Sequence, residues 1–289
     1  MSATSLTWDG RSIPGPGGQP AVAVSLTGPS LAQARTQARS AIDAGADVLE
    51  LRVDLLEEAG ALAAPAPLDA ATAAAQVLEC LRGLREAIDT TDGADAGSPV
   101  LLTCRTAAEG GRAQLDDTAY GSLLRSVLDG LTDWAPERRP AAIDVEVQRD
   151  CLPQVCAQAH ALGVDVVASF HDFEATPADE ALEEVLARMA REGADLAKIA
   201  VWPTSADDVA RLLGVCARAT AGAGERSGLD VPVAAMSMGA LGAVSRVAPA
   251  FGTALTFAVV PDEQGQARAS APGQLPIQDV RRCLELLRV

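Results

Sequence analysis

The stretch Asp195-Leu-Ala-Lys-Ile-Ala-Val201 decides the fold: it is a short apolar run that follows Gly193 and ends before Pro203. An apolar run of this length, bounded by glycine and proline, predicts a buried β-strand. Lys198 stands at its centre and is the sole lysine among the 23 lysine and arginine residues of the chain. All the other residues in this set are therefore arginines.

The isolated lysine has two interpretations. Arginine keeps its proton near neutral pH, whereas a lysine in a dry environment can lose its proton and attack a carbonyl carbon. Lys198 is therefore a candidate nucleophile that forms a Schiff base. The alternative is a structural lysine that extends from the strand end to solvent or pairs with a carboxylate. The strand alone favours neither interpretation.

The rest of the chain alternates strands and helices around this stretch. Seven further apolar runs predict strands, at residues 22–26, 48–52, 100–105, 141–147, 164–170, 231–236 and 254–259. Eight strands, each followed by a helix or a loop, predict an α/β protein with a closed (β/α)8 TIM barrel. An open doubly wound sheet is the alternative, but no Gly-x-Gly-x-x-Gly motif follows the first strand.

The beginning of the chain lies outside this repeat. Residues 5–13, with a turn at Asp9-Gly10, predict a short β-hairpin. We therefore expect a single domain over residues 1–289, in which residues 1–20 form the hairpin and a linker and residues 21–289 form the barrel.

Local signals predict where several helices begin and end. Thr176, followed by proline and acidic residues, is expected to cap the helix that starts near Asp179. Ser205 and Asp208 have the spacing of a capping box. The last helix is expected over residues 275–287.

Composition disfavours several classes of protein. The net charge of −16 and the pI near 4.5 argue against nucleic acids and anionic membrane surfaces as partners. Residues 1–10 show no secretory signal, and no apolar stretch approaches the roughly 20 residues of a membrane helix. We expect a cytoplasmic protein whose six cysteines are reduced. Two histidines without metal-ligand spacing predict no metal site.

Polar residues gather at the predicted carboxyl ends of the strands, where barrel enzymes carry their active sites. Residues two apart share one face of a strand, so Lys198 is expected to point into the barrel while Ala197 and Ile199 point outward. By the same rule Glu50, Arg52 and Asp54 share one face of their strand, and so do Thr103 and Arg105, Asp144 and Glu146, and Ser169 and His171. Other polar residues follow the ends of strands: Glu109, Ser245, Arg246, Ser270 and Gln274.

These residues also have structural interpretations. Glu50, Arg52 and Asp54 could form ion pairs that fill the barrel, and His171 could be a packed loop histidine. Asp144 and Glu146 are as well suited to orienting arginines as to reacting. A sole lysine beside a histidine, several inward arginines and matched carboxylates is nevertheless hard to explain by packing alone. Inward arginines suit an acidic substrate.

A set of motifs occurs in order between residues 20 and 289. They are Ser25, Glu50-Leu-Arg52-Val-Asp54, Arg105-Thr-x-x-Glu109-Gly-Gly, Ser169-x-His-Asp-Phe-x-x-Thr-Pro177, Lys198-Ile-Ala, Met236-Ser-Met-Gly239 with Ser245-Arg246, and Ala269-Ser-Ala-Pro-Gly-Gln274. Together they resemble type I 3-dehydroquinate dehydratases, and the set is far more specific than any one motif. The chain departs from the usual pattern at Thr253, where serine is common, and in a longer loop at residues 261–268.

The resemblance implies a shikimate-pathway enzyme that dehydrates 3-dehydroquinate to 3-dehydroshikimate by syn elimination through an imine on Lys198. It implies that His171 transfers the proton and that Glu109 orients and tunes His171. The implied substrate-binding residues are Ser25, Glu50, Arg52, Arg105, Arg246, Ser270 and Gln274, with Arg246 on the substrate carboxylate. It also implies a homodimer and a small-molecule substrate, with no metal and no organic cofactor. Cations are expected beside Lys198.

Two other functions are compatible with these residues. A class I aldolase also forms a barrel imine, but a phosphorylated sugar would need a glycine-rich cradle after strands seven and eight. Residues 237–242 (Ser-Met-Gly-Ala-Leu-Gly) resemble such a cradle only faintly. An inactive barrel that senses shikimate intermediates or scaffolds other proteins is the second alternative. The presence of both Lys198 and His171 argues against it.

Overall fold

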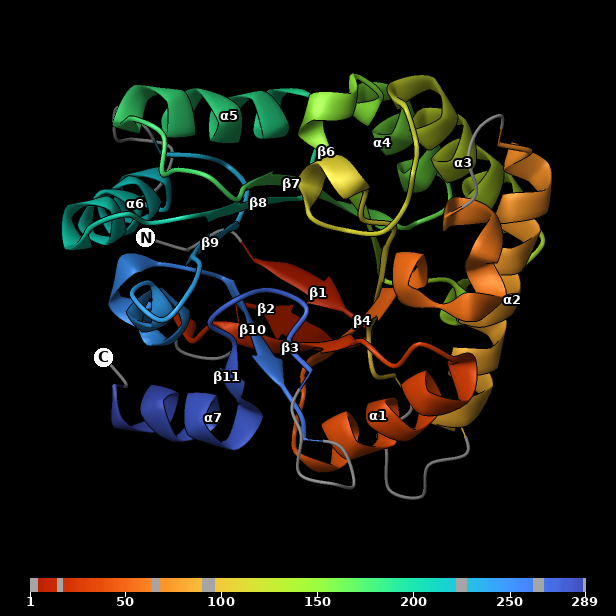
Figure 1. Cartoon of the computed structure of the whole chain (residues 1–289), viewed down its shortest axis with the longest axis horizontal. Coiled ribbons are helices and arrows are strands. Elements are labelled where there is room, and N and C mark those ends of the chain that lie inside the picture. The colour runs from red at the N-terminus through yellow and green to blue at the C-terminus, as the bar shows by residue number, and fades with distance from the viewer. Residues whose placement is uncertain are drawn as a thin grey trace.

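Parallel strands form the centre of the molecule. The computed structural model describes residues 5–14, 18–63, 68–89, 97–221, 228–261 and 268–287. Within these ranges the central strands are β3 (Ala21–Leu26), β4 (Val48–Arg52), β5 (Val100–Thr103), β6 (Ala142–Glu146), β7 (Asp165–Asp172), β8 (Leu196–Val201), β9 (Val233–Ser237) and β10 (Leu255–Val259). Each corresponds to a strand predicted from the sequence, and helices surround them on the outside (Figure 1).

The central strands close into a barrel. They pair in the order β10-β3-β4-β5-β6-β7-β8-β9, always in parallel. The ends of this sheet meet where the amide of Ala254 donates to the carbonyl of Val233 at 2.7 Å. The amide of Ala235 also donates to Oγ1 of Thr253 at 3.3 Å. The predicted TIM barrel is therefore confirmed, and the open sheet is excluded because its edges would not meet.

Helices form the outer layer. They are α1 (Leu31–Asp43), α2 (Ala70–Asp89), α3 (Asp117–Gly130), α4 (Leu152–Ala161), α5 (Asp179–Arg191), α6 (Ala206–Ala219) and α7 (Ile277–Leu286). After β9 the described chain forms short 3₁₀ turns at Ala243–Val247 and Pro249–Phe251. Across the described ranges, the helices lack the combined length and apolar character that crossing a lipid bilayer requires.

The predicted caps of α5 and α6 can be compared with the residues that precede these helices in the structure. The capping box of Ser205 and Asp208 is present at the start of α6. The predicted cap by Thr176 is wrong: residue 178 precedes α5, and the Thr176 hydroxyl instead donates to the carbonyl of Trp202 at 3.0 Å. This hydrogen bond to the residue after β8 replaces the predicted cap. The last helix begins at Ile277 because the two residues before it pair with β10 as strand β11 (Leu275–Pro276).

Alternation along the strands separates two apolar cores. On β8, Ala197 and Ile199 belong to the core between the sheet and the helices, whereas Leu196 and Ala200 belong to the core inside the barrel. Lys198 shares the parity of Leu196 and Ala200 and therefore points inward. The predicted orientation of this side chain is confirmed.

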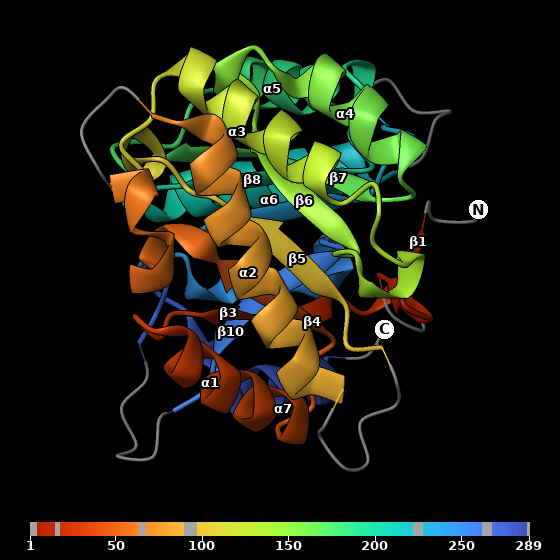
Figure 2. The same ribbon diagram turned by 90° about the vertical axis from the view of Figure 1, so that its right-hand side faces the viewer.

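A hairpin of β1 (Leu6–Trp8) and β2 (Arg11–Ile13) lies at one end of the barrel, beside the N-terminus (Figure 2). Trp8 and Ile13 are buried in the core inside the barrel. The indole Nε1 of Trp8 donates to Asp165, the first residue of β7, at 2.8 Å. The hairpin therefore closes the amino-terminal end of the barrel and leaves the carboxyl ends of the strands for the site.

Candidate active site

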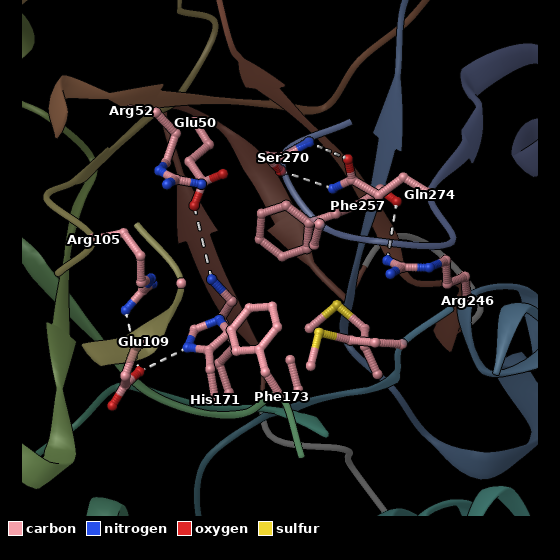
Figure 3. A pocket seen from close by; sticks show the side chains of 16 residues that line it. Glu50, Arg52, Arg105, Glu109, His171, Phe173, Arg246, Phe257, Ser270 and Gln274 are labelled. Atoms are coloured by element: carbon pink, nitrogen blue, oxygen red, sulfur yellow. Dashed lines mark hydrogen bonds and ion pairs between the residues drawn. The ribbon is translucent and has the colours of Figure 1, made fainter. Parts of the chain in front are cut away.

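Nine of the ten site residues predicted from the sequence line one pocket at the carboxyl ends of the strands (Figure 3). The space between these side chains, including the open solvent at its mouth, is about 480 Å³. Its lining comprises Glu50, Arg52, Arg105, Glu109, Gly110, His171, Phe173, Lys198, Ala200, Met236, Met238, Arg246, Phe257, Ser270, Ala271 and Gln274. Ser25 does not line the pocket but hydrogen-bonds to Glu50 and Ser270.

Lys198 reaches the centre of this pocket from β8. Its ammonium nitrogen lies 3.3 Å from Oδ2 of Asp144 and 3.7 Å from Oε1 of Glu50. The same nitrogen lies 4.6 Å from the ring centroid of Phe257, within the range of a cation–π contact. Two carboxylates, rather than the cations expected from the sequence, are therefore its nearest charged partners.

Glu50 connects the lysine to the opposite wall of the barrel. Its Oε1 accepts a hydrogen bond from Thr103 at 3.1 Å, and its Oε2 accepts one from Ser25. The Ser25 hydroxyl in turn accepts from Ser270 at 2.8 Å, and Gln274 donates to the Ser270 hydroxyl at 3.0 Å. The segment after β10 is therefore tied to Glu50 by a chain of hydrogen bonds.

Arg105 organises the carboxylates of β6. Its guanidinium lies 2.8 Å from Asp144, 3.2 Å from Glu146 and 3.5 Å from Glu109. Burial alone would lower the pKa of Arg105, but these carboxylates raise it well above its usual value. Asp144 and Glu146 therefore hold an arginine, which is the structural interpretation offered by the sequence.

Arg52 forms a two-pronged ion pair with Asp54, at 2.9 and 2.8 Å. Burial would raise the pKa of Asp54, but the hydrogen bonds and charge of Arg52 lower it below its usual value. Asp54 also accepts from the backbone amides of Arg105 and Arg112, at 3.2 and 3.1 Å. Asp54 is thus a structural residue that fixes two loops, while Arg52 lines the pocket.

His171, near the end of β7, pairs with Glu109 from the 3₁₀ turn after β5. Nδ1 of His171 lies 2.8 Å from Oε2 of Glu109, which leaves Nε2 as the ring nitrogen without a partner in the described residues. Burial, together with the charges of Arg105, Lys198 and Arg52, lowers the pKa of His171 well below its usual value.

The pKa of the Glu109 carboxyl group is shifted in the opposite direction, upward. Burial raises its pKa to about 8; Arg105 opposes this rise, while Glu146 and Asp144 add to it. Its second oxygen, Oε1, is buried and has no hydrogen-bond partner among the described residues. Burial therefore favours the uncharged form of both members of the pair.

Arg246 is a buried cation that lacks a carboxylate partner among the described residues. It is only 1% exposed, and its guanidinium donates to the carbonyls of Pro272 at 2.9 Å and Phe257 at 3.5 Å. Its Nε is buried without a hydrogen-bond partner within the described part of the chain. Burial lowers its pKa to about 10. A bound carboxylate would supply the missing counter-charge.

The sequence analysis assigned no role to the apolar lining residues, although Met236, Gly110 and Phe173 stand within the motifs quoted there. Phe257 lies outside those motifs, but its inward parity on β10 could have identified it. Gly110 and Phe173 lie in loops, where strand parity gives no signal. Within the described ranges, no group of three or more His, Cys, Asp or Glu side chains is placed to hold a metal ion.

Comparison with known proteins identifies relatives over nearly the whole chain. Residues 22–289 match the family model described as "Type I 3-dehydroquinase". The 3-dehydroquinate dehydratase of Klebsiella pneumoniae subsp. pneumoniae is 37% identical over 274 residues, covering 93% of this chain and 94% of that one. The protein of the same name from Lactiplantibacillus plantarum is 36% identical over 275 residues, covering 94% of each chain.

Solved structures are similar over the same extent. The type I 3-dehydroquinate dehydratase from Clostridium difficile, crystallised with covalently modified comenic acid, gives a TM-score of 0.80 at 29% identity over 99% of both chains. The 3-dehydroquinate dehydratase from Geobacillus kaustophilus gives 0.78 at 28% identity, over 98% of this chain and 96% of that one.

Proposed function

This chain belongs to the type I 3-dehydroquinase family, and we propose that it converts 3-dehydroquinate to 3-dehydroshikimate in the shikimate pathway through an imine on Lys198. One observation carries the proposal. The chain's sole lysine lies inside the barrel at 4% exposure, between an imidazole–carboxylate pair and a buried arginine that lacks a counter-charge in the described residues.

The proposed reaction begins when Nζ of Lys198 attacks the C3 ketone and the ketone oxygen leaves as water. The resulting protonated C=N bond draws electrons from the adjacent C2–H bond, so Nε2 of His171 can remove that proton and leave an enamine. The enamine electrons then expel the C1 hydroxyl, which takes the proton from His171 and leaves as water from the same face. Water added to the C=N bond releases product and amine, so the net change is the loss of one water.

We assign the substrate carboxylate to Arg246, because a paired guanidinium–carboxylate contact would satisfy its buried charge. Glu109 orients the imidazole through the 2.8 Å contact to Nδ1. The ring hydroxyls are assigned to the polar groups around Lys198, namely Glu50, Arg52, Arg105, Ser270 and Gln274, with Ser25 acting through Glu50. Phe257 and Met236 offer an apolar face to the carbocycle.

The decisive experiment adds borohydride together with 3-dehydroquinate. Hydride reduces a C=N bond to a stable secondary amine, so peptide mapping should find the substrate-derived mass on Lys198. The chain has one lysine, which makes the assignment unambiguous. Lack of an adduct, or an adduct confined to the N-terminal amine, would contradict the imine mechanism.

The alternatives predict different outcomes. The amide of Gly239 donates to the carbonyl of Pro272 at 3.1 Å, so this part of the weak glycine cradle is already occupied, which disfavours a phosphorylated aldolase substrate. An aldolase would turn over sugar phosphates rather than 3-dehydroquinate. An inactive barrel would bind 3-dehydroquinate without forming the conjugated enone product, whose absorbance is measured directly.

We further propose a single-domain cytoplasmic enzyme that works as a homodimer and binds neither nucleic acid nor membranes. Trp8 and Ile13 support one domain because they complete the core inside the barrel. The net charge of −16 supports the lack of polyanion binding. Sedimentation analysis at micromolar concentration tests the dimer, and a single cooperative unfolding transition tests the domain count.

A further inference from the structure

A partly exposed aromatic ring lies beside the imidazole of the pocket. Phe173 follows β7 and is 38% exposed. Its ring lies beside that of His171 (Figure 3). The two rings are stacked, with centroids 6.4 Å apart and planes inclined by 18°. This is the offset stacked geometry that aromatic rings prefer.

Gly110 provides the space for this ring. It directly follows Glu109 and has a φ of +79°, a left-handed conformation that favours glycine. A Cβ built at this position would lie 2.5 Å from two carbons of the Phe173 ring. The backbone conformation therefore favours glycine, and a side chain at this position would displace the Phe173 ring.

The proton-transfer pair next to this contact is dry. The side chains of His171 and Glu109 are 9% and 5% exposed, and Oε1 of Glu109 is buried without a hydrogen-bond partner in the described residues. An ionised carboxylate with a bare, buried oxygen is costly, whereas its protonated form is tolerated. Access of water would reverse this preference.

We propose that the Phe173–Gly110 contact keeps water from the Glu109–His171 pair and so sets the pH range in which His171 acts as a base. Phe173 is thus a positioning residue that acts through the pair. The catalytic part of this inference depends on the proposed function, because it assigns proton abstraction to His171. Exclusion of water from the pair does not depend on it.

The protonation states show why dryness matters. While Glu109 holds its proton, its hydroxyl donates to Nδ1 of His171, so the ring hydrogen stays on Nε2 and this nitrogen cannot accept another proton. When Glu109 ionises, it accepts from Nδ1–H and Nε2 becomes a free base. Because burial raises the pKa of Glu109 above its usual value, kcat/KM should rise with pH up to a plateau.

Water at the pair brings the pKa values of Glu109 and His171 closer together. Hydration stabilises the carboxylate, so the pKa of Glu109 falls, and it stabilises imidazolium, so the pKa of His171 rises. The other charged groups around the pair are Arg105, Arg52, Arg149, Lys198, Asp144 and Glu146. None of them is substituted in the variants of Phe173 and Phe251, so all the proteins compared carry the same set of charges.

The test compares Phe173→Ala with Phe251→Ala. Both phenylalanines are 38% exposed, but Phe251 lies in the 3₁₀ turn after β9 and does not line the pocket. In Phe173→Ala we expect the rising limb of kcat/KM to move to lower pH by about 1 unit. Phe251→Ala should leave the limb unchanged, and Phe173→Tyr should restore it because the ring is kept.

NMR of the imidazole gives a second readout that needs no substrate. The chain has two histidines, and the second, His160, lies on α4 away from the pocket, so the variants at positions 173 and 110 should leave its signals unchanged. The His171 ring should stay uncharged well below pH 6.5 in the unmodified protein and acquire charge at higher pH in Phe173→Ala. Gly110→Ala, which pushes against the ring, should shift the titration in the same direction.

Unchanged kinetic and NMR midpoints in Phe173→Ala, or equal shifts in Phe251→Ala, would overturn the proposal. Borohydride trapping separates this result from failure of the proposed function. If the unmodified protein forms the Lys198 adduct but the midpoints stay fixed, only the water-exclusion inference is lost. If no adduct forms, the NMR titration alone decides whether the contact keeps the pair dry.

Discussion

The two ends of the barrel interior contrast sharply although the same strands build both. At the amino-terminal end the inward residues are apolar, among them Val48 on β4 and Leu196 on β8. Two residues further along each strand, about 7 Å away, the inward positions are Glu50 and Lys198, both buried and charged. The apolar end is closed by Trp8, whereas the charged end opens into the pocket.

This contrast teaches that stability and reactivity are separated along the barrel axis. Apolar side chains contribute stability in proportion to the surface they bury. Buried ion pairs contribute little net stability, because desolvation offsets their attraction. Substitutions at the apolar end should therefore affect folding, and substitutions at the charged end should affect turnover.

The largest effect is expected for Lys198→Met, which removes the amine that forms the imine. Turnover of 3-dehydroquinate should fall by about 10⁶-fold, measured by product absorbance. Circular dichroism checks that the barrel still folds, since the loss also leaves Asp144 and Glu50 without the ammonium. If Lys198→Met kept more than a tenth of the original activity, reactivity would not depend on the charged end of the barrel.

His171→Ala should leave the amine intact and remove the base. Turnover should fall by about 10³–10⁴-fold, while borohydride still traps substrate on Lys198. The split between trapping and turnover is the measurement, because a misfolded variant would lose both. Full turnover would remove His171 from its proposed role.

Trp8→Ala tests the opposite end of the barrel. Loss of this buried indole should lower the free energy of unfolding by about 3–5 kcal/mol, measured by urea denaturation. Below the unfolding transition, kcat should stay within about twofold of its original value. Trp8→Phe is the matched control, since it keeps most of the apolar surface and removes only the hydrogen bond to Asp165. A large loss of kcat would show that the two ends are coupled.

Arg246→Ala should have the smallest effect, although it too belongs to the charged end. It removes the proposed partner of the substrate carboxylate, so kcat/KM should fall by about 10²-fold. Stability should change little or rise, because the guanidinium is buried without a carboxylate partner in the described residues. A strongly destabilised variant would instead make Arg246 a structural residue.

Much of the architecture was predictable because its signals are local. The strand at Lys198 follows from an apolar run between glycine and proline, and its inward direction follows from alternation. The cap at Ser205 is also local and is present, whereas the hydroxyl of Thr176 is drawn to the carbonyl of Trp202, 26 residues away in sequence. Local patterns fail where a distant segment competes for the same group.

The sequence by itself determined the barrel, the inward row of polar residues and the isolation of Lys198, because strand alternation and residue type act over a few positions. Only the tertiary structure decided that Asp144 and Glu50 flank the lysine and that Arg105 joins the β6 carboxylates. Only the fold placed Phe173 against Gly110. These contacts depend on which strands are neighbours in the closed ring and how deeply each group is buried, and both are set by the whole fold.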